Sequence, residues 1–350
     1  MRWSVPKFFS SAIGVDLGTS NTLIYVKGQG VVMAEPSIVA INQKTGRVVA
    51  VGVDASQMIG RTPAHIQAIR PLINGVISNF EMAEEMLGYF LKKTASLTGS
   101  NFFRPQVVVG VPSSVTNVER RAVRDALESA GAREVHVIEE PMAAAIGINM
   151  PIYDPVGNMI VDIGGGTTDI AVISLGGVVR SKSLHIAGEK FNQDIINYVR
   201  DEFKILLGER TAEEVKIAIG TAMSLGSSNE TLVRGRDLVT GLPREVAITD
   251  SDVREAIFNS LTIFVDAVKE VLESTPPEVV SDIMRRGLVL TGGSASLRGL
   301  RELLEKELEI PVHLAEDPLT AVVRGAGIVL DDLDHYRDIL IDNEDELPPR

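Results

Sequence analysis

The sequence contains an internal repeat that constrains the fold more than any other feature. Residues 14–26 (GVDLGTSNTLIYV) align without a gap with residues 160–172 (IVDIGGGTTDIAV). In each copy an apolar run ends in an acid and a turn rich in small residues, and a second apolar run follows at once. This pattern predicts a β-hairpin in both places. Two such units about half a chain apart predict two similar domains that face one another across a ligand.

The two predicted turns have the composition of an anion site. Three successive glycines at residues 164–166 let backbone N–H groups approach an anion closely, and the threonine hydroxyls beside them add donors. Asp16 and Asp162 occupy equivalent positions at the ends of the first strands. A carboxylate beside a phosphate requires a divalent cation between them, because like charges repel. The alternative is that both copies are only glycine turns, and the matched acids make it the weaker interpretation.

Strands and helices alternate along the rest of the chain. Buried strands are predicted at residues 106–111 and 287–291, and amphipathic helices at residues 81–96, 117–130 and 250–274. The alternation predicts an α/β fold, with mixed sheets because the hairpins contribute antiparallel strands.

Further elements are predicted from shorter patterns. Residues 231–246 are expected to form a strand pair interrupted at Gly241. Helices are expected at residues 189–207, 211–225, 296–308 and 318–330.

Composition excludes several classes of function. The 350 residues include no cysteine, so disulfides, thiolate metal sites and cysteine nucleophiles are ruled out. The formal net charge is −13, and residues 331–350 hold eight acids against two arginines, which is typical of a solvated acidic tail. This acidity argues against nucleic acid as a partner. No apolar run approaches the ~20 residues of a transmembrane helix, and no signal peptide is evident, so a cytoplasmic location is expected.

Four segments each join a strand end to a turn with small or polar residues: 16–22, 139–143, 162–169 and 292–296. Each alone is a weak signal, since most glycine-rich turns only turn the chain. The sequence has no Gly-x4-Gly-Lys-Ser/Thr motif and no Gly-x-Gly-x-x-Gly before a helix, so P-loop and Rossmann sites are excluded. In this order and spacing, the four segments together indicate one nucleotide site.

As a set, these segments resemble the actin/Hsp70/sugar-kinase ATPase superfamily, and in particular its MreB family of bacterial actins. The matching stretches extend from Gly14 to about Leu330 and are highly specific as a group. They are GVDLGTSNTL from residue 14, IEEPMAAAIG from 138, VDIGGGTT from 161, GERTAEEVK from 208 and LTGG from 290.

The resemblance implies an actin-like fold of two lobes, each built on an RNase H-like domain with a mixed sheet, with the nucleotide in the interlobe cleft. The first lobe would comprise residues 1–150 with an insertion at about 38–71. The second would comprise residues 151–317 with an insertion at about 188–249. The helix at about 318–330 would return to the first lobe, before the acidic tail at 331–350.

The resemblance also implies how ATP or ADP and Mg2+ would be held. Asp16 and Asp162 would hold the magnesium, largely through its water molecules. Glu140 would act as general base on the water that attacks the γ-phosphate. The two turns would hold the β- and γ-phosphates through Gly18, Thr19, Ser20, Asn21, Thr22, Gly164, Gly165, Gly166, Thr167 and Thr168.

The adenosine end of the site rests on fewer residues. The resemblance implies that Glu213 and Lys216 touch the ribose and adenine, although an exposed helical charge pair is nearly as good an interpretation. Gly292 and Gly293 would let the adenine lie against backbone. Glu139 is a neighbouring candidate for the base, but an acid at a helix N-terminus suits it better.

Aromatic residues suggest a membrane contact. Phe102 and Phe103 stand in a polar loop, where such a pair usually packs into the core. The resemblance favours the alternative, because MreB proteins have a hydrophobic membrane-inserting loop here. An interfacial anchor of Trp3, Phe8 and Phe9, with nearby cations, would add to it.

The implied function is that of a membrane-associated bacterial actin that polymerises, hydrolyses ATP slowly and organises cell-wall synthesis so that cells stay rod-shaped. The implied partners are other copies of the chain in paired protofilaments, the inner surface of the cytoplasmic membrane and the cell-wall elongation machinery. A plasmid-segregating or division actin is the closest alternative. An Hsp70-type ATPase would need a substrate-binding domain, and a small-molecule kinase would need a catalytic aspartate that the sequence does not reveal.

Overall fold

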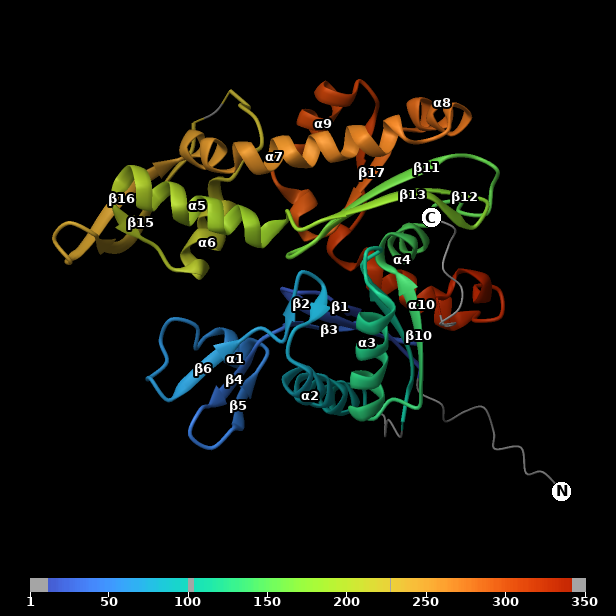
Figure 1. The fold of residues 1–350 in the computed structure, drawn as a ribbon, viewed down its shortest axis with the longest axis horizontal. Helices are drawn as coiled ribbons and strands as arrows, with labels where there is room; N and C mark the ends of the chain where they lie inside the picture. Colours follow the sequence, from blue (N-terminus) through green and yellow to red (C-terminus); the bar gives the residue numbers. More distant parts are fainter. Residues whose placement is uncertain (1–11, 100–103, 227, 342–350) are drawn as a thin grey trace. The chain divides into compact units, whose positions relative to one another are not determined.

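The computed structural model describes residues 12–99, 104–226 and 228–341 of the chain. The chain divides into two compact units: one runs to Pro151 and resumes at Thr320, and the other is Ile152–Leu319. Figure 1 shows the last helix, in red, lying among the blue and green elements of the first unit. The first unit is therefore built from both ends of the described chain.

The first unit contains a five-stranded mixed sheet with the order β10-β9-β1-β2-β3. The hairpin strands β1 and β2 are antiparallel, as are β2 and β3, whereas β9 and β10 run parallel to β1. The strands are β1 (Ala12–Leu17), β2 (Asn21–Val26), β3 (Gly30–Pro36), β9 (Gln106–Val111) and β10 (Glu134–Glu139).

The second unit repeats this sheet, with the order β13-β12-β11-β17-β18 and the same sequence of parallel and antiparallel neighbours. The predicted α/β fold with mixed sheets is confirmed. The sequence repeat is a structural duplication, because β11 and β12 occupy the places of β1 and β2. The strands are β11 (Asn158–Ile163), β12 (Thr168–Ser174), β13 (Gly177–Leu184), β17 (Leu288–Thr291) and β18 (Val312–Leu314).

The helices of the first unit start and end where local chemistry predicts. The Asn79 side chain accepts the Met82 N–H at the start of α2, and Gly99 ends that helix in the left-handed conformation. Thr116 and Glu119 form a capping box at the start of α3. The helices are α2 (Phe80–Thr98), α3 (Asn117–Ser129), α4 (Glu140–Gly147) and α10 (Ala321–Asp331).

Helices α4 and α10 pack so closely that glycine is required at their contact. A Cβ on Gly147 would lie 1.9 Å from the Ala321 carbonyl oxygen, and one on Gly325 would lie 1.8 Å from the Ala143 carbonyl oxygen. Real Cβ atoms do not approach other atoms so closely, so the two backbones touch through these glycines. This contact fastens the C-terminal helix to the first unit.

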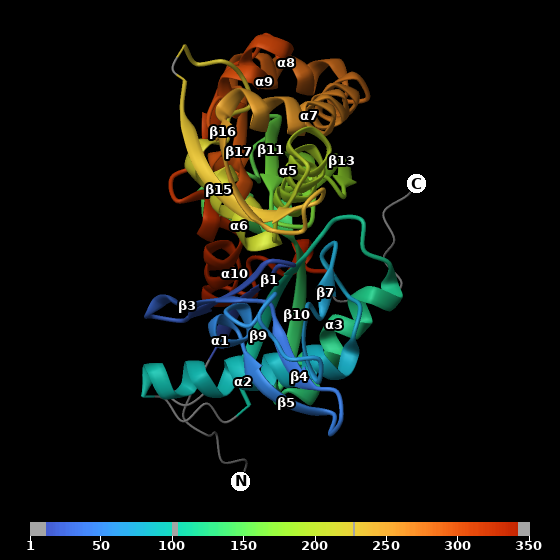
Figure 2. The same cartoon turned by 90° about the vertical axis from the view of Figure 1, so that its left-hand side faces the viewer.

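The first unit also carries a small insertion with a three-stranded sheet, order β5-β4-β6, beside α2 (Figures 1 and 2). From the sequence pattern, strands are expected at residues 37–41 and 47–51. These lie close to β4 and β5, whereas β6 and the short pair β7-β8 have no counterpart among the predicted strands. The elements are β4 (Val39–Asn42), β5 (Arg47–Val51), α1 (Val53–Ser56), β6 (Ile66–Ile69), β7 (Leu72–Ile73) and β8 (Val76–Ile77).

The second unit places its helices around its five-stranded sheet and carries a second three-stranded sheet, order β14-β15-β16. The helices are α5 (Gly188–Phe203), α6 (Glu209–Ile219), α7 (Asp250–Glu273), α8 (Pro277–Arg286) and α9 (Leu300–Leu308). The strands of the small sheet are β14 (Ile205–Leu206), β15 (Glu230–Asp237) and β16 (Pro243–Thr249).

Several predicted helix bounds in this unit are wrong. Helix α5 stops at Phe203 instead of residue 207, because Lys204 adopts a left-handed conformation with φ of 57° and the next two residues pair with β15. Helix α6 stops at Ile219, well before residue 225.

Other bounds fail because of glycine and proline. Helix α9 begins at Leu300, after a short 3-10 turn at Gly293–Ser296, and not at residue 296. Helix α10 likewise begins at Ala321, after a 3-10 turn at Pro318–Thr320. Helix α8 was not predicted: Pro277 opens a new helix there, since proline fits a first helical turn.

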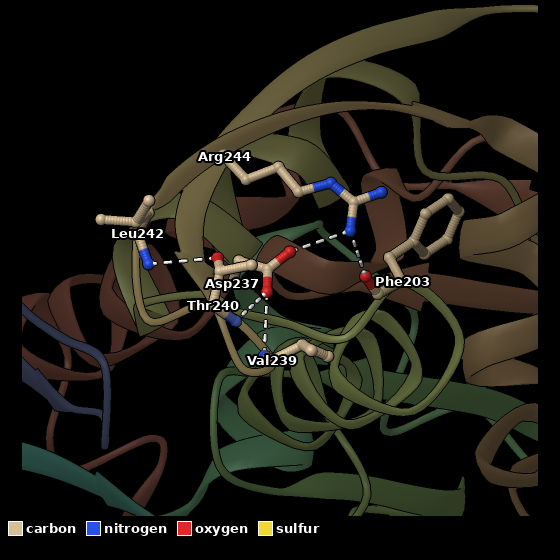
Figure 3. A network of polar contacts seen from close by, with 6 residues as sticks. All are labelled: Phe203, Asp237, Val239, Thr240, Leu242 and Arg244. Carbon is tan, nitrogen blue, oxygen red and sulfur yellow. Dashed lines mark hydrogen bonds and ion pairs between the residues drawn. The ribbon is translucent and has the colours of Figure 1, made fainter.

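A polar network closes the β15–β16 hairpin (Figure 3). The Asp237 carboxylate accepts the N–H groups of Val239 and Thr240, both at 2.8 Å, and the Arg244 guanidinium at 3.0 Å. Arg244 also donates to the Phe203 carbonyl at the end of α5. These hydrogen bonds, first among them the one from Thr240, lower the pKa of Asp237 to about 2.

We expect the Asp237→Asn variant to lose a pH-dependent part of its stability. A folded-state pKa of about 2, below the ordinary 3.8, means that the ionised carboxylate stabilises the fold above pH ~4 and that this contribution fades as pH falls towards ~2. Thermal unfolding should therefore separate variant from wild type at pH 6 and bring them together near pH 2–3. Asp266→Asn, at an exposed position on α7, is the control and should show no such convergence.

Candidate functional site

The first turn of the repeat connects β1 to β2, with Leu17 paired to Thr22. A Cβ on Gly18 would lie 2.7 Å from the Asn21 carbonyl oxygen, so the tight turn requires glycine there. Asn21 is exposed and Ser20 is partly exposed, while Thr19 and Thr22 are buried. The sequence pattern therefore predicts the turn correctly, but its two threonines do not face solvent.

The buried threonine hydroxyls tie the first turn to the chain on either side of the insertion. The Thr22 and Ser37 hydroxyls lie 2.9 Å apart, and Ser37 also donates to the Gly18 carbonyl at 2.7 Å. The Thr19 hydroxyl accepts the Gly75 N–H at 2.8 Å. In this structure Thr19 and Thr22 hold the turn in shape.

Asp16 and Glu140 lie at the same end of the first unit's sheet. Asp16 pairs in register with Gly110, and a Cβ on Gly110 would lie 3.3 Å from the Glu140 Cγ. Glu140 is buried at the first residue of α4. Desolvation raises the pKa of Asp16 to about 7, which shows that the protein alone holds this carboxylate in an environment unfavourable to its charge.

Glu139 has a different environment from Glu140. It is the N-cap residue of α4, and its carboxylate accepts the Ser113 hydroxyl at 2.9 Å. Its position at the N-cap agrees with the interpretation of Glu139 as an acid at a helix N-terminus.

The second turn of the repeat is held by the N-terminus of α5. Within the turn, the Gly164 N–H donates to the Thr167 carbonyl at 2.9 Å. The N–H groups of Gly188 and Glu189 donate to the carbonyls of Gly164 and Gly165. The buried Thr168 hydroxyl donates to the Ile186 carbonyl at 2.6 Å and so also helps to hold the turn in shape.

Asp162 lies between the second turn and the segment after β17. It is buried and pairs in register with Asp169 on one side and Thr291 on the other. A Cβ on Gly292, where φ is +85°, would lie 2.4 Å from Asp162 Oδ1. Asp169, which aligns with Leu23 in the first copy of the repeat, accepts a hydrogen bond from the Ser183 hydroxyl on β13.

We therefore expect Gly292→Ala to disrupt the second unit's part of the site. The methyl group would collide with Asp162 and with the Ile163 carbonyl oxygen, also 2.4 Å away, and the positive φ would cost a further ~1–3 kcal/mol. Nucleotide affinity, measured by titration with a fluorescent ATP analogue, should fall at least tenfold. Gly208→Ala, at a glycine with nothing within 4 Å, should keep the wild-type affinity.

The candidate adenosine residues form one hydrogen-bonded group in the second unit. The Lys216 ammonium donates to the Gly188 carbonyl and to Glu213, both at 2.9 Å, and the Asn192 amide donates to the same Glu213 oxygen. The Lys216 side chain is 11% exposed and that of Glu213 is 45% exposed, so the ion pair is buried on its lysine side only. The Ser294 hydroxyl donates to the Gly164 carbonyl at 2.8 Å. This bond links the segment that contains Gly292 and Gly293 to the second turn.

The structure adds residues that the motifs did not reveal. Ser37, Gly75 and Asn192 each bond directly to a predicted site residue. They stand outside the repeated segments, so no local pattern identified them. Gly188 could have been suspected only as the glycine that opens α5, where a Cβ would lie 2.7 Å from the Ser294 hydroxyl.

Two predictions concern contact with a membrane. Trp3, Phe8, Phe9, Phe102 and Phe103 lie outside the described residues. Among residues 12–99, 104–226 and 228–341, no helix is long and apolar enough to cross a bilayer.

The aspartates expected to hold magnesium, Asp16 and Asp162, lie one in each unit. The described chain offers no cluster of three or more His, Asp or Glu side chains around one point. What each unit offers instead is one buried or half-buried aspartate beside a turn, which fits a cation that keeps most of its water and binds phosphate.

Comparisons with known proteins agree with one another. The family described as "MreB/Mbl protein" matches residues 10–338. The chain is 52% identical to the cell shape-determining protein MreB of Escherichia coli K12, covering 96% of this chain and 98% of that protein. It is 49% identical to Mbl of Bacillus subtilis 168, covering 93% and 97%. The structure of MreB5 of Spiroplasma citri bound to AMPPNP superposes with a TM-score of 0.89 at 38% identity, covering 95% and 99%.

Proposed function

The chain belongs to the MreB/Mbl family of bacterial actins, and on that premise we propose that it binds ATP with Mg2+, hydrolyses it slowly and assembles into filaments that determine cell shape. The predicted family and actin-like fold are confirmed by these matches. These matches do not favour the alternatives, which are division and plasmid-segregating actins, Hsp70-type ATPases and sugar kinases. The observation that carries the proposal is the duplicated hairpin, with an aspartate before the turn in each unit.

Nucleotide binding is supported by the relative MreB5, which was solved with AMPPNP and with ADP. We propose that the turns 18–22 and 164–168 present backbone N–H groups to the β- and γ-phosphates. Their buried threonine hydroxyls hold the turns in shape, so the amides would carry most of the contact. Lys216, Glu213 and the backbone at Gly292 and Gly293 would hold the adenosine.

Asp16 and Asp162 would hold Mg2+ through its water molecules. The bound cation supplies positive charge beside the phosphates and so favours the charge distribution of phosphoryl transfer. It would also offset the desolvation that raises the pKa of Asp16. A single carboxylate from each unit is the donor set expected for a hydrated, phosphate-bound magnesium ion.

Hydrolysis needs a group that orients and deprotonates water, and Glu140 is the proposed general base. Its carboxyl is held at the start of α4, at the sheet end that also carries Asp16. A water beside the γ-phosphate would donate its hydrogen bond to the Glu140 carboxylate, which would take the proton as the phosphoryl group transfers. Glu139 lies at the N-cap of α4, where its carboxylate accepts the Ser113 hydroxyl.

The arrangement of the filaments and their cellular partners is part of the same proposal. Filaments would consist of paired protofilaments at the inner face of the cytoplasmic membrane, together with the cell-wall elongation machinery. Trp3, Phe8, Phe9, Phe102 and Phe103 would contact lipid, because aromatic side chains favour the membrane interface.

A sedimentation assay tests the proposed function. With ATP and Mg2+ the protein should form sedimenting polymer, and with ATP and vesicles it should co-sediment at lower protein concentration. A protein that forms no polymer with any nucleotide would contradict the proposal.

We expect the double variant Phe102→Ser/Phe103→Ser to lose most vesicle binding and to polymerise normally in solution. Removing two aromatic side chains takes away the apolar area that would enter the interface. Vesicle flotation with and without ATP measures the difference. The matched control is Phe258→Ser, an exposed phenylalanine on α7 in the second unit, which should float like wild type; equal flotation of all three proteins would disprove the membrane role of this loop.

A further inference from the structure

Helices α5 and α6 of the second unit pack against one another at the candidate adenosine residues (Figure 1). Gly188 and Asn192 are four residues apart on α5, so they lie on one face of that helix. Glu213 and Lys216 are three residues apart on α6 and likewise share a face. The two faces meet, because Lys216 donates to the Gly188 carbonyl and Asn192 donates to the Glu213 carboxylate. Asn192 therefore reaches Glu213 from the neighbouring helix.

The Glu213 carboxylate is held through one of its two oxygens. Its Oε2 atom accepts both the Asn192 amide and the Lys216 ammonium. Its Oε1 atom has no hydrogen-bond partner within the described chain, and the side chain is partly exposed. A carboxylate oxygen left free in this way can accept a hydroxyl group of a ligand.

Asn192 is an unusual residue for its position. It is 4% exposed, and its carbonyl oxygen, Oδ1, is buried without a hydrogen-bond partner among the described residues. Such a buried polar atom costs free energy. The amide cannot turn over to relieve this cost, because its oxygen would then face the Glu213 carboxylate, and both groups are acceptors.

The surroundings of Asn192 do not call for a polar side chain. The other buried side chains of α5 are Phe191, Ile195 and Val199, all of them apolar. An apolar residue would therefore suit this position in the core better. A buried polar group kept at a cost to stability points to a role outside packing, and the contact that Asn192 makes is the one to Glu213.

This contact fixes the direction of a side chain that would otherwise be mobile. A glutamate on a helix surface samples several rotamers, and a ligand that binds it must offset the entropy lost when it is fixed. Lys216 supplies charge through a long side chain on the same helix as Glu213. Asn192 has a short, buried side chain on a different helix, so it defines where the carboxylate points before a ligand arrives.

We propose that Asn192 positions Glu213 so that Oε1 accepts a hydroxyl group of the ribose. Adenine would lie against the backbone at Gly292 and Gly293, which leaves the ribose hydroxyls as the donors for this carboxylate. Asn192 acts through Glu213 and does not touch the nucleotide. The consequence is a preference for ribonucleotides over deoxyribonucleotides. The inference rests on the proposed binding of ATP and deepens it, because it names the residue on which ribose recognition depends.

Titration calorimetry with ATP, 2′-deoxyATP and 3′-deoxyATP measures this preference. The full-length protein is used with Mg2+, below the concentration at which it polymerises. Wild type should bind at least one deoxy analogue ~10-fold or more weakly than ATP, as expected when a hydrogen bond to a charged group is lost. In Asn192→Leu the affinity for ATP should fall towards that for the analogue, so that the preference shrinks to less than ~3-fold.

Two further variants make the test specific. Asn197→Leu is the matched control: it makes the same substitution on the same helix, at a partly exposed asparagine whose side-chain oxygen accepts the Gln193 amide. It should keep the wild-type preference. Asn192→Asp preserves size but replaces the donated hydrogen bond with repulsion between two carboxylates, and it should lose the preference as Asn192→Leu does. A defect in folding would weaken all three nucleotides alike and leave their ratios unchanged.

The inference and the proposed function fail in different ways. Wild-type ratios in both Asn192 variants, or an equal loss of affinity for all three nucleotides, would overturn the inference. A wild-type protein that binds ATP and both deoxy analogues equally would also overturn it, while ATP binding would stand. A wild-type protein that binds none of the three would contradict the proposed function, and the inference with it.

Discussion

Replacing Gly147 with alanine should prevent the first unit from reaching a stable fold. The new methyl group would lie 1.9 Å from the Ala321 carbonyl oxygen and 2.8 Å from the Gly325 nitrogen, both backbone atoms of α10. Backbone cannot swing aside like a side chain, so α4 and α10 must separate. Overpacking usually costs ~1–3 kcal/mol, and a forced separation of two backbones should reach or exceed the upper end. Soluble yield and thermal unfolding by calorimetry measure the effect.

Gly88→Ala is the matched control. Gly88 is also helical, in α2, but nothing lies within 4 Å of its missing Cβ. Alanine there should stabilise the protein by ~0.5–1 kcal/mol, because glycine weakens a helix interior. If both alanine variants unfold at the same temperature, the close contact between α4 and α10 is not a determinant of stability.

Glu140→Gln should reduce ATP hydrolysis by ~10²- to 10⁴-fold, the usual contribution of a general base. Glutamine has nearly the same shape, so the start of α4 should be preserved. ATP affinity should therefore change little. Single-turnover phosphate release and titration with a fluorescent ATP analogue separate the two effects.

The neighbouring Glu139→Gln variant controls for damage to the helix start. Its carboxylate is bonded to Ser113, so we expect a modest loss of stability and nearly normal hydrolysis. Normal hydrolysis by Glu140→Gln, together with a large loss in Glu139→Gln, would reverse the assignment of the base.

The sequence predicted those parts of the fold that local chemistry determines. The hairpins were predictable because an apolar run, a glycine turn and a second run lie within thirteen residues. Helix α3 was predictable because its capping box and amphipathic pattern are local. Strands β7, β8 and β14 have only two residues each, too few for any periodicity. They exist through pairing with another segment, such as β14 with β15.

In the candidate site, too, some residues could be predicted from local sequence and others are brought together only by the fold. The turns and their aspartates could be found from the repeat, because the residues are contiguous. Ser37 could not, since it lies in the bend after β3 and its bond to Thr22 joins residues fifteen positions apart in the sequence. The resemblance suggested phosphate contacts for the threonines as well. The hydroxyls of Thr19 and Thr168 also bond to the surrounding chain, and only three-dimensional placement reveals these contacts.

The return of α10 to the first unit affects the order in which the protein can fold as it is synthesised. Helix α10 packs on α4, β1 and β9, so the first unit lacks part of its core until the final helix has left the ribosome. The second unit, Ile152–Leu319, is complete in sequence before that helix is made. The half that is translated first is therefore finished last, and during this interval its apolar surface at Gly147 stays uncovered, the condition in which a nascent chain is most prone to aggregate.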